Sequence, residues 1–215
     1  CYFAEMAPRG PTLLSIPFDI LMTPISFSLA SQITPQPLVA PDSYFKNVSE
    51  ILVQSRDLII ITEHGGRSSN EANILTKLAT LLGAPVFEFF LPTYKNFPRT
   101  HPLHGKGPVE ELLKKMDCIL IVGSSAPWHP PLVDIPENCK VILVEEDPLR
   151  PRAPYWGYKT EYCIAGDIGC NLERLYCYTE NEVKKRPDVL EIIKQRAEHW
   201  KDYNKNKMKS WLQEL

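Results

Sequence analysis

The sequence predicts an α/β fold, a doubly wound parallel sheet of five or six strands with a further helix at the C-terminus. Short, continuous apolar runs alternate from residue 43 onward with longer segments whose apolar residues recur every three or four positions. The runs are rich in Val, Ile and Leu, as expected for strands that are covered on both faces. Strands that alternate with helices favour parallel pairing through right-handed crossovers, with helices on both faces of the sheet.

Five apolar runs are the predicted strands: residues 57–62, 85–90, 118–123, 140–147 and 162–167. The predicted helices lie over residues 43–55, 68–82, 108–116 and 167–177. Ser43 and Asp167 stand where they would cap the first and last of these helices. Ser68 and Glu71 have the spacing of a capping box, and Gly83 is expected to end the helix that they begin.

The two ends of the chain differ from this alternating region. Residues 22–42 carry several prolines and show no periodicity, which indicates a linker. From Asp188 to Leu215, apolar residues return every three or four positions opposite a charged face. This pattern predicts an amphipathic helix that buries Trp200 and Trp211 against this domain or a neighbouring one.

Composition excludes several classes of protein. With 24 basic and 26 acidic residues, the chain has no overall positive charge that would favour nucleic acid or a membrane surface. It also has no apolar run approaching the roughly 18–20 residues of a membrane helix. The six cysteines form no C-x-x-C pair, which favours unpaired thiols in a reducing, cytoplasmic setting. His101 and His104 lack a third ligand at a suitable spacing, so no metal site is expected.

Candidate binding residues follow the predicted strands, because ligands of open parallel sheets lie beyond the carboxyl ends of the strands. Gly65 and Gly66 would let the backbone approach an anion ahead of a helix N-terminus, although a simple tight turn is the alternative. Glu145 and Asp147 should face the same side and could accept hydrogen bonds from a ribose diol, unless they are solvated loop acids. Asp167 could join them or serve only as a helix cap. The G-x-G-x-x-G, Walker and nucleophile-elbow motifs are absent, so no residue is assigned as catalytic.

Five stretches, taken in order, resemble the thiamine-diphosphate-dependent enzymes, and in particular the acetolactate synthase large subunit. The first, GPTLLSIPFDIL, resembles the last strand of that family's pyrimidine-binding domain. The others resemble successive parts of its central domain: LIIITEHGGRSSNEANILTKLATLLGAPVF, FPRTHPLHGKG, CILIVGSSAPWHPP and KVILVEEDPLRPRAPYWGYKTEYCIAGD.

The resemblance implies a division of the chain. Residues 1–21 would be the tail of the pyrimidine-binding domain, 22–42 a linker, 43–180 the central α/β domain and 181–215 a helical connector toward the diphosphate-binding domain. The family's catalytic glutamate would precede this chain, and its motif for Mg²⁺ and thiamine diphosphate would follow it. The chain is therefore expected to be an excerpt without activity of its own.

The same resemblance bears on nucleotide binding. In acetolactate synthases the central domain binds the adenine half of FAD, and related decarboxylases bind ADP there or nothing. Four positions match the family's nucleotide contacts: Gly65, Gly66, Glu145 and Asp167. Two features depart from the family pattern, since His64 replaces a glycine and residues 124–129 replace a stretch that usually supplies arginines.

The parent enzyme implied by the resemblance is a cytoplasmic homodimer or tetramer. It would decarboxylate a 2-oxo acid such as pyruvate and transfer the remaining unit, as in branched-chain amino acid biosynthesis, with thiamine diphosphate and Mg²⁺ bound outside this chain. A parent decarboxylase for oxalyl-CoA, benzoylformate or indolepyruvate is an alternative. Another is a stand-alone nucleotide-binding or scaffolding module with the same fold.

Overall fold

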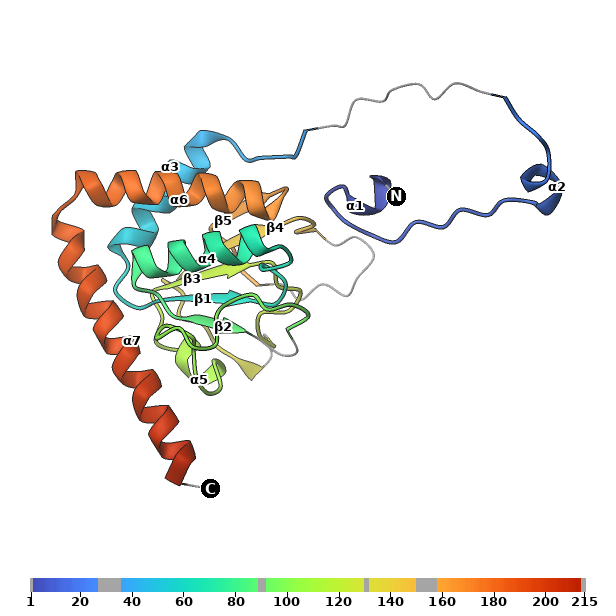
Figure 1. Ribbon diagram of the computed structural model, residues 1–215. Coiled ribbons are helices and arrows are strands. Elements are labelled where there is room, and N and C mark those ends of the chain that lie inside the picture. The colour runs from blue at the N-terminus through green and yellow to red at the C-terminus, as the bar shows by residue number, and fades with distance from the viewer. Residues whose placement is uncertain (1, 27–35, 89–91, 130–131, 150–157, 214–215) are drawn as a thin grey trace.

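One parallel sheet forms the centre of the molecule. The computed structural model describes residues 2–26, 36–88, 92–129, 132–149 and 158–213 (Figure 1). Within these ranges the strands are β1 (Leu58–Thr62), β2 (Val86–Glu88), β3 (Cys118–Val122), β4 (Lys140–Glu145) and β5 (Tyr162–Ala165). Their order is β2-β1-β3-β4-β5, and every neighbouring pair is parallel. The predicted parallel α/β sheet is confirmed, with five strands among the described residues.

Helices cover both faces of the sheet. Helices α3 (Asp42–Gln54), α4 (Ser69–Leu82) and α6 (Ile168–Lys185) lie together on one face, whereas the short α5 (Glu110–Leu113) lies on the other (Figure 1). The chain moves outward from β1 to β2 through α4, and then back past β1 to β3 through α5. Two right-handed crossovers that run in opposite directions must place their helices on opposite faces.

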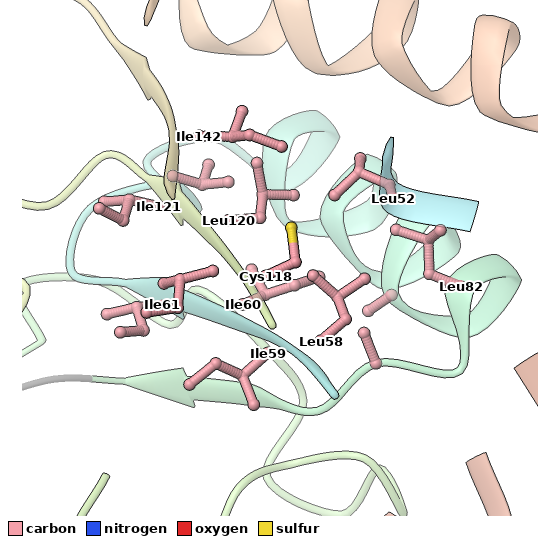
Figure 2. Close-up of a cluster of buried hydrophobic side chains, with 14 of the residues drawn as sticks. Leu52, Leu58, Ile59, Ile60, Ile61, Leu82, Cys118, Leu120, Ile121 and Ile142 are labelled. Carbon is pink, nitrogen blue, oxygen red and sulfur yellow. The ribbon is translucent and has the colours of Figure 1, made fainter. Parts of the chain in front are cut away.

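The central strands β1 and β3 are buried over their whole length because side chains from both faces meet helices or loops, whereas the edge strand β5 is only partly buried. Leu58, Ile59, Ile60 and Ile61 have no exposed surface, and Figure 2 shows them packed with residues of β3, β4 and the neighbouring helices. Each such side chain contributes roughly 1.5–3 kcal/mol through burial, so this cluster is the main source of the domain's stability.

The capping residues predicted for the helix ends are mostly confirmed. The Ser68–Glu71 capping box is present, and Gly83 ends α4 with φ 62°. Asp167 caps α6 by accepting a 2.8 Å hydrogen bond from the Cys170 N–H. The predicted Ser43 cap is wrong, because Pro41 occupies the N-cap position with extended backbone and α3 begins one residue before Ser43.

Several elements differ in length from the prediction, and β5, predicted over 162–167, ends at Ala165. The helix predicted over 108–116 is regular only over α5, and α6 continues to Lys185 instead of ending near residue 177. The strand predicted over 140–147 ends at Glu145. Part of the strand predicted over 85–90 lies outside the described residues.

The last helix, α7 (Asp188–Gln213), packs along one side of the domain (Figure 1). Trp200 is buried, with its ring centroid 6.1 Å from that of Phe87 at the end of the sheet. Trp211 is 44% exposed, so it is not buried against this domain, and its burial against a neighbouring domain stays a prediction. The helix extends away from the sheet toward its C-terminal end (Figure 1), and Trp211 lies in its last turn.

Two polar side chains fasten α7 to the domain. The buried Arg196 donates hydrogen bonds to the main-chain oxygens of Leu82 and Ser55, which end α4 and α3. Asn204 accepts a hydrogen bond from the Lys106 N–H and donates one to the Pro102 oxygen, at 3.1 and 2.8 Å. Both contacts satisfy main-chain groups outside regular hydrogen bonding.

The N-terminal part is an arm that carries α1 (Tyr2–Glu5) and α2 (Phe18–Leu21) (Figure 1). Residues 10–17 have no regular secondary structure and are exposed. The part of the predicted linker that precedes α3 is held on the domain, since the Leu38 oxygen accepts from the Asp167 N–H and the Ala40 N–H donates to Asn171. Residues 27–35 of that linker lie outside the described chain.

The thiol and histidine predictions can be compared directly with the structure. The five described cysteines are free, and burial raises the pKa of Cys118 and Cys139 to about 12, so both stay protonated. The described residues contain no group of three or more His, Cys, Asp or Glu that could hold a metal ion. No helix in the described part of the chain is long and apolar enough to cross a membrane.

Candidate ligand site at the carboxyl ends of the strands

The carboxyl ends of β1, β3, β4 and β5 bring the predicted site loops together. His64, after β1, lies 3.3 Å from Glu145 at the end of β4. The Ser125 N–H, after β3, donates a 2.7 Å hydrogen bond to Glu63. Loops that are far apart in the sequence therefore meet at one edge, as the parallel topology requires.

The glycine turn packs tightly against the protein. The Gly65 N–H donates to the Thr62 hydroxyl at 3.1 Å, and the Gly66 N–H donates to the Asn96 side chain at 2.9 Å. A Cβ at Gly66 would overlap the Asn96 backbone, and one at Gly65 would lie 2.7 Å from Val122. These glycines are needed for close packing, and their N–H groups point at side chains of the domain.

Glu145 is buried, with 3% of its surface exposed. Its Oε1 accepts a 2.8 Å hydrogen bond from the Glu146 N–H and also faces His64. The alternative of a solvated loop acid is therefore wrong for this residue. Strand β4 ends at Glu145, so strand alternation does not reach Asp147, and the shared orientation of the two side chains stays a prediction.

Glu146 is the main anionic partner at this edge, and the sequence did not single it out. Both of its carboxylate oxygens lie 3.1 Å from the Arg67 guanidinium, and Arg9 of the N-terminal arm donates to the same carboxylate. Burial alone would lower the pKa of Arg67, but the adjacent Glu146 carboxylate outweighs burial and raises it. Arg67 also lies over the Tyr94 ring, 5.8 Å from its centroid.

The Asp167 side chain has two partners within the protein. Its side chain caps α6, and its second oxygen lies 3.4 Å from an Arg9 nitrogen. Arg9 thus bridges Glu146 and Asp167 from a segment more than 130 residues away in sequence. No local pattern in the sequence could have indicated this contact.

A cavity of about 680 Å³ opens beside this edge, between α4 and the loop that follows β2. Ala72, Thr76, Tyr94 and Phe97 are among its lining residues. Its volume lies in the range of about 300–1,000 Å³ that small-molecule sites occupy. The cavity shares Tyr94 with the cation–π contact of Arg67.

Comparison with known proteins identifies the family. Residues 45–175, more than half of the chain, match the family described as "Thiamine pyrophosphate enzyme, central domain". The chain belongs to this family. The matched range lies within the central domain that the sequence predicted over residues 43–180, and the sheet order with its covering helices is the fold of that domain.

Individual relatives carry more specific names. Benzoylformate decarboxylase of Pseudomonas aeruginosa is 26% identical over 201 residues, which cover 87% of this chain and 37% of the relative. A Mycobacterium smegmatis protein described as a thiamin diphosphate-dependent enzyme is 26% identical, with a TM-score of 0.65 over 82% of this chain and 35% of its own. Benzoylformate decarboxylase of Polynucleobacter necessarius, at 21% identity, has a TM-score of 0.64 over 81% of this chain and 34% of its own. The chain thus spans little more than a third of each relative.

The residues present can be tested against the nucleotide that some members of the family bind. A diphosphate needs donors that face it, yet Gly65 and Gly66 donate to the protein and Arg67 is held by Glu146. A ribose needs acceptors, yet Glu145 is buried against His64. In this arrangement the edge does not fit a nucleotide diphosphate.

Proposed function

We propose that this chain is the non-catalytic central domain of a thiamine-diphosphate-dependent decarboxylase for a 2-oxo acid of the benzoylformate class. The supporting observation is the match to benzoylformate decarboxylase over 201 residues. The predicted central domain, 43–180, contains fewer residues than this, so the match includes flanking segments. Benzoylformate was among the parent substrates expected beside pyruvate, and the acetolactate synthase subtype has no comparable support.

The chain's contribution to such an enzyme is positional. Thiamine diphosphate, when bound, supplies the electron sink for the carbanion that decarboxylation leaves. The buried sheet and the Arg196 and Asn204 anchors of α7 would provide a rigid body between the cofactor-binding domains. We infer that the sites for thiamine diphosphate and Mg²⁺ lie in those domains, and that the parent is a homodimer or tetramer.

The substrate is tested on the whole protein that contains this chain. With thiamine diphosphate and Mg²⁺ added, benzoylformate should yield CO₂ and benzaldehyde at a kcat/KM at least about tenfold above that for pyruvate. The alternative, acetolactate synthase, would instead convert two pyruvate molecules into acetolactate and CO₂. Acetolactate as the main product, with benzoylformate unused, would overturn the proposed substrate class and leave the family membership intact.

The isolated chain is tested separately. Calorimetric titration of the 215-residue chain with thiamine diphosphate and Mg²⁺ should give no saturable heat. The arrangement at the sheet edge also leads us to expect no binding of ADP or FAD there, because Arg9 and Arg67 are both held by Glu146. Saturable ADP or FAD binding that Glu145→Ala abolishes would favour the stand-alone nucleotide-binding alternative.

A further inference from the structure

A second concave surface shares Arg99 with the cavity described above. This cationic groove, of about 570 Å³, is formed by α7 and the loop of residues 99–106. Five basic side chains line it: Arg99, Lys106, Lys201, Lys205 and Lys209. Among the described residues that line the groove, none is Asp or Glu. Such a concentration of one sign of charge in a concave surface raises the local concentration of anions.

The sequence shows where acidic residues lie around the groove. The loop 99–107 and the stretch 203–213 of α7 contain none, and Glu198 and Asp202, which flank Lys201 on α7, are not among the lining residues. Glu88 lies behind the loop, but its carboxylate accepts from His104 at 3.1 Å and from Asn96. The acidic group close to the loop is therefore already paired within the protein.

The two walls of the groove are fixed relative to each other. Asn204, with 6% of its surface exposed, holds the Lys106 N–H and the Pro102 oxygen of the loop against α7. The Phe97 ring packs edge-on against His101 with centroids 4.9 Å apart. The groove is thus preorganised, which reduces the entropy that a ligand would lose in ordering it.

His101, one of the residues that line the groove, is influenced by a neighbouring lysine. Burial of the imidazole, and then the charge of Lys201, lower the pKa of His101. His101 is also within 3.4 Å of the Thr80 hydroxyl. The basic side chains that line the groove all carry positive charge, so each of them would attract a bound anion.

We propose that the cationic groove binds a small molecule that carries two or more phosphate groups. The groove has the volume of a small-molecule site, and Lys and Arg are the side chains that hold phosphate oxygens. Pro102 and Met208 supply apolar surface beside the lysines for the rest of such a ligand. The proposal is independent of which 2-oxo acid the parent enzyme uses.

The test is calorimetric titration of the 215-residue chain with inorganic tripolyphosphate. Wild-type protein should show one saturable site and bind orthophosphate at least about tenfold more weakly. Lys201→Gln/Lys205→Gln should weaken tripolyphosphate binding at least about tenfold, because each charge-assisted hydrogen bond contributes about that factor. The control Lys46→Gln/Lys194→Gln removes the same charge from exposed helical positions outside the groove and should change affinity less than about twofold.

Three results would overturn the proposal. They are no saturable binding at millimolar tripolyphosphate, equal affinity for orthophosphate, and an equal loss in both double variants. Thermal unfolding followed by circular dichroism shows whether the variants fold. If the groove variant melts early, Arg99→Gln/Lys209→Gln replaces it, because both of these side chains are exposed.

Discussion

Arg196 shows how one buried side chain can hold distant elements in place. Helices α3 and α4 end beside each other with main-chain oxygens that lack intrahelical partners. The guanidinium of Arg196 donates to the oxygens of Ser55 and Leu82 at these two ends. Burial lowers the pKa of Arg196 to about 10, so it still carries a positive charge near neutral pH. That charge faces the negative ends of two helix dipoles, which favours it.

Replacing Arg196 with Met should therefore destabilise the domain. The apolar stem is kept, but the oxygens of two helix ends lose a charged donor, and we expect a loss of about 3 kcal/mol in the free energy of unfolding. Urea denaturation followed by circular dichroism measures this. Arg174→Met is the control, because its pair with Asp42 is exposed to solvent and should contribute little to stability. Equal midpoints for the two variants would contradict the assigned role.

The contribution of Glu88 to the free energy of unfolding should depend on pH. Burial favours the protonated form of its carboxyl, but hydrogen bonds from His104 and Asn96 outweigh burial and lower its pKa. A lowered pKa gives stability that is fully present above the ordinary value of 4.5 and is lost as the pH falls through the folded-state value. Glu88→Gln should thus cost about 1–2 kcal/mol at pH 7, and the difference from wild type should shrink below pH 4.5.

The measurement for Glu88 is urea denaturation of both proteins between pH 3 and 8. Glu161→Gln is the matched control, because Glu161 pairs with Lys140 at 3.1 Å on the surface and should change stability little at any pH. If the Glu88→Gln variant were less stable than wild type by the same free energy at every pH down to 3, the charged carboxylate would not be the source of the stability difference.

The candidate site shows which residues a sequence can indicate. Glu145 and Asp167 were predicted because they follow apolar runs, and the parallel topology then places them at one edge. Arg9 and Glu146 were missed, because their contact joins positions 137 residues apart and depends on how the arm returns to the domain. No pattern in the sequence indicated that the Asn96 side chain accepts a hydrogen bond from the Gly66 N–H.

At the scale of elements, prediction succeeded where burial alone decides the structure. The strands were located to within two residues where they are described, because a run that is buried on both faces has no polar interruption. The errors occurred at helix ends, where a proline or a hydrogen-bonded turn sets the backbone conformation. Pro41 fixes the start of α3 ahead of Ser43, and the residues around α5 form hydrogen-bonded turns that shorten the helix.

Gly83 lies where the end of α4 packs against α7, so replacing it tests the contact between these two helices. It ends α4 with φ 62°, and a Cβ there would lie 2.6 Å from the Ile193 oxygen and 2.9 Å from Ala197 on α7. Gly83→Ala should cost about 2 kcal/mol, since left-handed backbone costs about 1 kcal/mol for Ala and the overlap with α7 adds to it. Gly10→Ala, where a Cβ meets nothing within 4 Å, is the control in thermal unfolding. Equal melting temperatures would mean that α7 does not pack closely at Gly83.

At the scale of the whole molecule, apolar surface is concentrated in the N-terminal arm. Seven large apolar side chains between residues 13 and 25 are 61–97% exposed: Leu13, Leu14, Phe18, Ile20, Leu21, Met22 and Ile25. A stable domain rarely exposes so many adjacent apolar side chains, and such a surface usually contacts another protein surface. Under the function proposed above, other parts of the parent enzyme would cover this arm, since the chain spans 37% of benzoylformate decarboxylase.

The arm should therefore make the isolated chain self-associate. Trp200 is buried and Trp211 is 44% exposed, so the arm carries the largest group of exposed apolar side chains among the described residues. Light scattering should show a mass that rises with concentration for wild type, and Leu13→Asp/Phe18→Asp should shift this rise to higher concentration by at least about tenfold. Leu132→Asp/Leu149→Asp adds the same charges at isolated leucines that are 77% and 81% exposed, and should leave association unchanged. If wild type stayed monomeric at all concentrations, the arm would not drive association. If both double variants had an equal effect, the change in net charge would account for it instead of the arm.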